Sequence, residues 1–248
     1  MAATEQATLL VFTLGPDRER GRRQWLPACY AGLETGVHQR CLDEVLTAGR
    51  AAGCALRVST PDRELGELVA DGVTVDRQPD GQFGSRLVAA VARASAENNG
   101  PLIVVGTDTP GIDGDLVGAA LAAICEQPDT VVLGPAADGG IYLLAASGDI
   151  SDALAEVRWQ SSRTLASLTA ALRRFGWRVR LLAVRSDLDC RRDLERWIAR
   201  ATIGGPWRSL VGALRRALAA LAAAPIARDA LVPAPAWCSV PVGRAPPR

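Results

Sequence analysis

The sequence predicts an α/β protein, a three-layer α/β/α sandwich with a mostly parallel central sheet. Short apolar runs that end in Gly, Pro or Asp alternate with longer segments whose apolar residues recur at helical spacing. Apolar residues make up 48% of the 248 residues and charged residues 22%. This composition is that of a globular protein with a sizeable core.

Strands are expected where an apolar run meets a turn-forming pair of residues. The first run, residues 7–14, ends at Gly15-Pro16, and the run at residues 101–106 leads into a loop that begins at Thr107. The remaining strands are expected at residues 55–59, 73–77, 130–133, 141–146 and 178–184. Residues 15–24, after the first strand, are expected to form an arginine-rich loop.

Helices are expected between these strands. Asp113 is placed to cap a helix that ends near Gln127, and Gly176 is placed to end a helix at Phe175. The expected helices, apart from the one that Asp113 caps, cover residues 36–52, 83–96, 162–175 and 191–200.

The C-terminal part differs in composition from the rest of the chain. We expect residues 1–203 to form one domain, and residues 204–248 to add an amphipathic helix (207–224) and a loosely ordered, proline-rich tail (228–248). The apolar stripe of this helix consists of Trp207, Leu210, Val211, Leu214, Leu218 and Leu221. We expect the stripe to pack on the domain; a homodimer contact is the alternative.

Composition excludes several classes of protein. The 28 basic and 27 acidic side chains leave a formal net charge of +1, which argues against a nucleic-acid-binding protein. Every basic residue is Arg, so lysine catalysis is excluded, and the single histidine, His38, excludes a multi-histidine metal site. The six cysteines form no C-x-x-C motif, and neither a signal peptide nor a transmembrane stretch is evident, so a cytoplasmic protein with reduced cysteines is expected.

Carboxylates follow three of the expected strands. Asp108 follows the strand at 101–106, Asp138 lies in the turn between the strands at 130–133 and 141–146, and Asp187 and Asp189 follow the strand at 178–184. Because the carboxyl ends of parallel strands share one edge of a sheet, these groups can converge there and hold Mg²⁺ or Mn²⁺ through oxygen atoms alone. The alternative is that each is a turn former or helix cap.

Five motifs follow one another between residues 81 and 194. They are Gly81-Gln82-x-Gly84-x-Arg86, Gly106-Thr107-Asp108-Thr109-Pro110-Gly111, Gly134-Pro135-Ala136-Ala137-Asp138-Gly139-Gly140-Ile141-Tyr142, Trp159 with Ser161-Ser162, and Ser186-Asp187-Leu188-Asp189-Cys190 with Asp193-Leu194. In this order and spacing they resemble the DUF2064 family, the radical SAM/selenodomain-associated transferase group of nucleotide-diphospho-sugar transferases with a GT-A fold. The resemblance is close over residues 81–197.

The resemblance implies roles for these residues. Asp108 matches the aspartate that holds a divalent metal on the nucleotide's diphosphate, with Thr107 beside it on the donor side, and Asp187 and Asp189 match the segment that supplies further ligands. Asp138, Gly139 and Gly140 match the loop that faces the acceptor.

Two further candidates follow from the residues themselves. Gln82, Gly84 and Arg86 open a helix whose backbone amides and arginine can meet an anionic or nucleobase group; a helix start with an exposed arginine is the alternative. Trp159 is a candidate wall of the acceptor pocket, and a core position is the alternative.

The first loop departs from the family pattern. The family has a K-x-P-x-x-G-x-V-K-T-R-L-like signature there, whereas this chain keeps Pro16 and has no lysine. Arg22 and Arg23 are candidates to bind the donor phosphates in place of the lysines. The alternatives are a solvated loop, a donor site that has decayed, or a different donor.

These observations together favour a metal-dependent transferase that uses a nucleotide-diphospho-sugar donor and an unknown small-molecule acceptor. Arg22 or Arg23 and Arg86 would neutralise the donor phosphates, and Asp138 would orient or deprotonate the acceptor. One alternative is a nucleotidyltransferase of the same fold that releases pyrophosphate. Another is a catalytically silent domain that binds a nucleotide or a partner.

Overall fold

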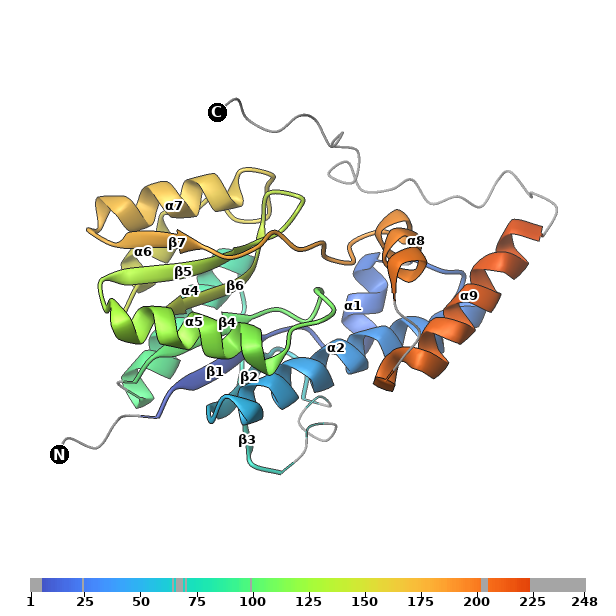
Figure 1. The fold of residues 1–248 in the computed structure, drawn as a ribbon, viewed down its shortest axis with the longest axis horizontal. Coiled ribbons are helices and arrows are strands. Elements are labelled where there is room, and N and C mark those ends of the chain that lie inside the picture. The colour runs from blue at the N-terminus through green and yellow to red at the C-terminus, as the bar shows by residue number, and fades with distance from the viewer. Residues whose placement is uncertain are drawn as a thin grey trace.

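The computed structural model describes residues 6–23, 25–63, 65, 69, 71–98, 100–201 and 205–223. Within them one sheet has the strand order β3-β2-β1-β4-β6-β5-β7, with helices on both faces (Figure 1). The strands are β1 (Thr8–Phe12), β2 (Ala55–Thr60), β3 (Val73–Arg77), β4 (Leu102–Val105), β5 (Thr130–Pro135), β6 (Ile141–Ala146) and β7 (Arg178–Leu181). The predicted fold class, a three-layer sandwich with a mostly parallel sheet, is confirmed.

Strand β6 runs against the rest of the sheet. It lies between β4 and β5 and is antiparallel to both. The pairs β1–β2, β1–β4, β2–β3 and β5–β7 are parallel. All strands except β6 therefore end at one edge of the sheet, where the segments that follow β1, β4, β5 and β7 meet.

The two faces of the sheet carry separate hydrophobic clusters. Helices α2 (Ala31–Ala51) and α5 (Gly114–Glu126) cover one face, and α4 (Phe83–Glu97), α6 (Ser151–Ala155) and α7 (Thr164–Arg174) cover the other. On β1, Leu9 and Val11 face the first layer and Leu10 the second, and all three are fully buried. Because β1 is buried on both faces, its sequence is a continuous apolar run rather than an alternation of apolar and polar residues.

The arginine-rich loop expected at residues 15–24 is wrong, because Pro16–Arg23 form helix α1. The segment has no apolar stripe and so no helical signal in its hydrophobic pattern. Its charges favour the helix instead: Asp17 and Glu19 lie in the first turn, arginines lie in the last, and Glu19 pairs with Arg23 one turn on. Pro16 suits the first helical position.

Other boundaries differ less. Helix α2 begins at Ala31, and β7 ends at Leu181, after which only an isolated bridge from Arg185 to Ala136 continues the pairing. The short helix α6 carries too few residues for a periodic pattern to be recognised. The two expected helix-end residues are confirmed. Asp113 caps the start of α5, where its side chain accepts a hydrogen bond from the Leu116 amide, and Gly176, with a φ of +84°, follows the end of α7.

The C-terminal helix α9 (Arg208–Ala223) packs on α2 and on α8 (Arg191–Arg200), beside the sheet (Figure 1). Val211 and Leu214 are buried there against Val37 of α2 and Leu194 of α8. The expected packing on the body of the chain is thus present. The boundary expected at residue 203 and the proline-rich tail lie outside the described residues. None of the described helices is long and apolar enough to cross a bilayer.

Substitution of Leu214 by Ala tests this packing. Leu214 has no exposed surface, so removal of its side chain leaves a cavity between α2, α8 and α9, and we expect a loss of about 2–5 kcal/mol in the free energy of unfolding. Urea unfolding measures the loss, with Arg216→Ala, at an exposed position of the same helix, as the control. Equal stability of the two variants would contradict the packing.

Candidate functional site

A cavity of about 260 Å³ opens at the carboxyl edge of the sheet. Its walls come from the ends of β1 and β4, from α1 and α4, and from the segments that follow β5 and β7. Ten of the thirteen candidate site residues line this cavity: Arg22, Arg23, Arg86, Thr107, Asp108, Asp138, Gly140, Trp159, Asp187 and Asp189. The other three, Gln82, Gly84 and Gly139, are neighbours of lining residues in the chain.

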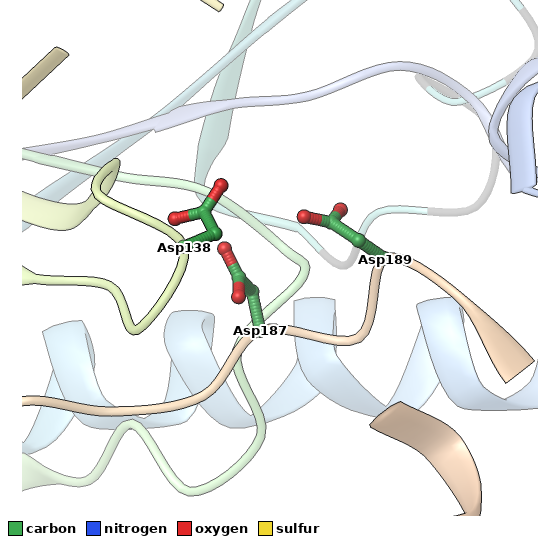
Figure 2. Close-up of side chains that lie close together, drawn as sticks. All are labelled: Asp138, Asp187 and Asp189. Atoms are coloured by element: carbon green, nitrogen blue, oxygen red, sulfur yellow. The ribbon is translucent and has the colours of Figure 1, made fainter. Parts of the chain in front are cut away.

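Three carboxylates form a close group in this cavity. Asp138, in the turn between β5 and β6, lies with Asp187 and Asp189, and one carboxylate oxygen of each lies within 4.8 Å of the others (Figure 2). Figure 2 shows the side chains directed toward a common space from two separate segments. Asp108, expected beside Asp187 and Asp189, is at the flank of the group, where the Arg23 guanidinium separates it from Asp189.

Hydrogen bonds between loops fix this arrangement. The Leu188 amide donates to the Asp108 carbonyl over 2.8 Å, and the Arg185 side chain donates to the Gly111 carbonyl over 2.6 Å. The backbone of Arg185 also bonds with Pro135 and Ala137, in the segment that leads to Asp138. The loops after β4, β5 and β7 are therefore held together as one unit that positions the carboxylates.

Glycine is required in the turn that carries Asp138. Gly139 has a φ of +94°, and a Cβ there would lie 2.1 Å from the Ser162 carbonyl oxygen, so no other residue fits. The Gly140 amide donates to Asp138 Oδ1 over 2.7 Å, which fixes the carboxylate. The glycines thus serve the close approach of this turn to the start of α7.

Burial and mutual repulsion make the carboxylates weak acids. Burial, reinforced by the charges of Asp189, Asp108 and Asp138, raises the pKa of Asp187 to about 8. Burial also raises the pKa of Asp189, with Asp108 adding to the rise and Arg23 opposing it. A group of oxygen donors that resists ionisation on its own fits a divalent cation, which stabilises the ionised forms together.

The arginines around the cavity differ in their partners. Arg23 is nearly buried and pairs with Glu19, Asp108 and Asp189, so it is not part of a solvated surface. Arg22 is about half exposed, with Glu19 3.8 Å away. The positions of both arginines face the cavity, whereas their role toward donor phosphates stays a prediction.

The Arg86 side chain is held in place by Gln78. Its Nη1 donates to Gln78 Oε1 over 2.6 Å, and both amide hydrogens of Gln78 are used by the Thr13 and Ser59 carbonyls. Burial, and then the positive charges of Arg22 and Arg18, lower the pKa of Arg86. Arginines 22 and 86 therefore create a positive region on the cavity wall, which suits an anionic ligand.

A buried polar network at the base of the cavity was not predicted. Thr13 and Thr107 hydroxyls lie 2.6 Å apart, and each lies 3.1 Å from His38 Nε2. Burial, and then the charge of Arg23, lower the pKa of His38 to about 4, so the ring is neutral at pH 7. The sequence offered one signal for this network, a lone histidine on the apolar face of a helix.

Trp159 lies between the cavity and the aromatic cluster of α4, and its role toward an acceptor stays a prediction. It lines the cavity, and it also packs against Phe83 at 5.7 Å between ring centroids. A Cβ on Gly84 would lie 2.5 Å from the indole, so glycine at this position permits the contact between α4 and Trp159.

Solved structures of other proteins share this fold. A crystal structure from Desulfovibrio desulfuricans G20, named "putative nucleotide-diphospho-sugar transferase", has a TM-score of 0.73 at 20% identity, over 87% of this chain and 96% of that one. The manganese complex of Rv0371c from Mycobacterium tuberculosis H37Rv has a TM-score of 0.52 at 20% identity, over 79% and 100% of the two chains. A cytidylyltransferase from Leptospira borgpetersenii has a TM-score of 0.54 at 12% identity, over 90% of this chain and 99% of that one.

A family model also matches part of the sequence. The model of a family described as "Uncharacterized protein conserved in bacteria (DUF2064)" matches residues 41–161, and the expected resemblance to this family is confirmed. The match includes Asp108, Asp138 and Trp159, whereas Arg22, Arg23, Asp187 and Asp189 lie outside it. No curated protein matches the sequence.

Replacement of Asp187 by Asn is expected to change the stability of the metal-free protein little at pH 4 and to stabilise it progressively as the pH rises toward 8. A carboxyl with a pKa of about 8 in the fold and about 4 in the unfolded chain lowers stability as the pH rises between those values, because the unfolded chain releases a proton that the folded protein retains. The amide carries no charge and escapes this loss.

Thermal unfolding in a chelator across this pH range measures the effect. Asp115→Asn, at an exposed position of α5, is the control and should show no trend. A stability difference for Asp187→Asn that does not grow with pH would contradict the buried, repulsive environment of this carboxyl.

Proposed function

We propose that the protein is a divalent-metal-dependent transferase that takes a nucleotide-diphospho-sugar as its donor. The observation that carries this proposal is the pairing, in one cavity, of a carboxylate group with an arginine-lined wall. Acidic and basic groups in one cavity suit a ligand in which phosphates and a cation are bound together. The fold shared with transferase structures supports the same assignment.

The proposed ligands of the cation are Asp187 and Asp189, with Asp108 and Asp138 on their two flanks. A bound Mg²⁺ or Mn²⁺ would neutralise charge on the departing nucleoside diphosphate. Arg22 and Arg86 would bind the diphosphate oxygens, with Gln78 holding Arg86 in place. Their charges favour the leaving group as its negative charge develops.

Asp138 is proposed to act on the acceptor. Its Oδ1 accepts a hydrogen bond from the Gly140 amide, and it lines the cavity together with Trp159 and Ser162. A carboxylate there can orient an acceptor hydroxyl and accept its proton. The acceptor is proposed to be a small molecule that stands against Trp159.

Nucleotidyl transfer is the second candidate, favoured by the likeness in fold to the Leptospira cytidylyltransferase. In that reaction a nucleoside triphosphate reacts with a phosphorylated acceptor and pyrophosphate leaves. The product separates the two candidates, since sugar transfer releases a nucleoside diphosphate. Calorimetry with a panel of nucleotides and nucleotide-sugars, with and without Mn²⁺, is the first experiment; absence of binding throughout would favour a catalytically silent domain.

Asp189→Asn is expected to weaken Mn²⁺-dependent nucleotide binding by about 100-fold, because Asp189 lies next to both flanking carboxylates and its loss removes charge that binds the cation. Asp108→Asn and Asp138→Asn should each weaken binding less, since each variant keeps Asp187, Asp189 and one of the two flanking carboxylates. Asp115→Asn again serves as control. Wild-type affinity in Asp189→Asn, with the fold intact by circular dichroism, would overturn the metal assignment.

A further inference from the structure

We propose that Arg23 occupies the place of a cation between Asp108 and Asp189 and competes with the divalent metal for these carboxylates. This inference rests on the proposed metal site and adds a role for Arg23 that differs from simple phosphate binding. When the metal binds, the guanidinium gives up the two aspartates and its Nη2 becomes available to a phosphate. Metal binding and donor binding are thereby coupled through one side chain.

The position of the guanidinium is the first support. Nη2 lies 3.5 Å from Asp108 Oδ2 and 3.8 Å from Asp189 Oδ1, so one nitrogen stands between the two carboxylates. Only 12% of the Arg23 side chain is exposed, and Asp189 is exposed to 16%. A cation that used both carboxylates would meet the positive charge of Arg23 at short range, in surroundings that screen it poorly.

The unequal contacts of Arg23 are the second support. Nη1 donates to the Leu188 carbonyl over 2.7 Å, and Nε lies 3.0 Å from Glu19 Oε2, whereas both aspartate contacts are longer than a charge-assisted hydrogen bond. Glu19 and Leu188 therefore hold the arginine, and the aspartates are its weaker partners. The contacts to Asp108 and Asp189 can be exchanged for metal contacts while Arg23 stays beside the cavity.

The charge balance is the third support. Asp108, Asp138, Asp187 and Asp189 line one cavity, and Arg23 is the arginine paired with two of them. Burial alone would lower the pKa of Arg23, but Glu19, Asp108 and Asp189 raise it above its ordinary value, so the guanidinium stays charged. Its charge offsets part of the carboxylate repulsion in the metal-free protein, the same task that a divalent cation performs.

Competition predicts effects of opposite sign for one substitution. Arg23→Gln should bind Mn²⁺ alone about tenfold more tightly than wild type, because a positive charge close to the metal is removed. The same variant should bind inorganic pyrophosphate in saturating Mn²⁺ about tenfold more weakly, because a phosphate donor is lost. A purely structural role would weaken both, and simple phosphate binding would leave Mn²⁺ affinity unchanged.

The experiment measures Mn²⁺ affinity by electron paramagnetic resonance at pH 8, and then pyrophosphate affinity by calorimetry. Arg20→Gln is the matched control, since this residue of α1 does not line the cavity, its side chain is 39% exposed, and it pairs with Asp17 over 4.0 Å; its Mn²⁺ affinity should stay within twofold of wild type. Arg23→Lys keeps the charge and should bind Mn²⁺ like wild type, and Glu19→Gln with Arg23→Gln avoids an unpaired Glu19 if the single variant unfolds.

The outcomes separate this inference from the proposed function. If wild type binds Mn²⁺ and a folded Arg23→Gln, alone or with Glu19→Gln, binds it no more tightly, the competition is overturned and the metal site stands. If wild type binds no Mn²⁺, the proposed metal site fails and the competition fails with it. Tighter Mn²⁺ binding together with weaker pyrophosphate binding supports the proposal.

Discussion

Repulsion between carboxylates at the carboxyl edge of the sheet is the constraint around which the rest of the site is arranged. Every strand except β6 ends at this edge, so Asp108, Asp138, Asp187 and Asp189 arrive in one cavity from three loops. Buried charges of one sign are unfavourable together, and the raised pKa values of Asp187 and Asp189 express that. The fold holds them there because hydrogen bonds join the three loops and Arg23 supplies an opposite charge.

The C-terminal helix is connected to this arrangement through Glu44. This α2 carboxylate accepts the Gly111 amide, in the loop after Asp108, over 2.9 Å, and its other oxygen accepts the Trp207 indole at the start of the C-terminal helical segment. The Gly111 carbonyl in turn accepts a hydrogen bond from the Arg185 side chain, and Arg185 lies two residues before Asp187 in the chain. A chain of contacts thus runs from the C-terminal helix to the carboxylates, so the packing of α9 and the geometry of the site depend on common residues.

The polar groups at the base of the cavity follow the same logic. A neutral His38 bonded to Thr13 and Thr107 places no further positive charge beside Arg23, and it ties α2 to the ends of β1 and β4. Gln78 does the corresponding work on the other side, where it joins β1 and β2 and fixes Arg86. The arginines and carboxylates of the cavity are therefore held by buried side chains that do not line up in any sequence motif.

The layers of the fold and most of the candidate residues could be predicted from the sequence. Apolar runs and helical spacing depend on local burial, so β1, β4 and α5 could be recognised, as could Asp113 at the start of α5 and Gly176 after the end of α7. The acidic residues could be recognised because they follow strands, and parallel strands must end together. The sequence did not identify α1, whose stability comes from charge placement and from pairing with distant carboxylates.

The grouping of the side chains could not be predicted from the sequence and follows from the packing of the loops. The tertiary structure brought Asp138 within 4.8 Å of Asp187 and Asp189, placed Arg23 between Asp108 and Asp189, and joined His38 to two threonines. These relations depend on loop conformation and on side-chain direction across 25 to 166 residues of chain, for which neither period nor spacing carries information. Local pattern fixes which residues reach the edge of the sheet, and the packing of the loops fixes which of them meet.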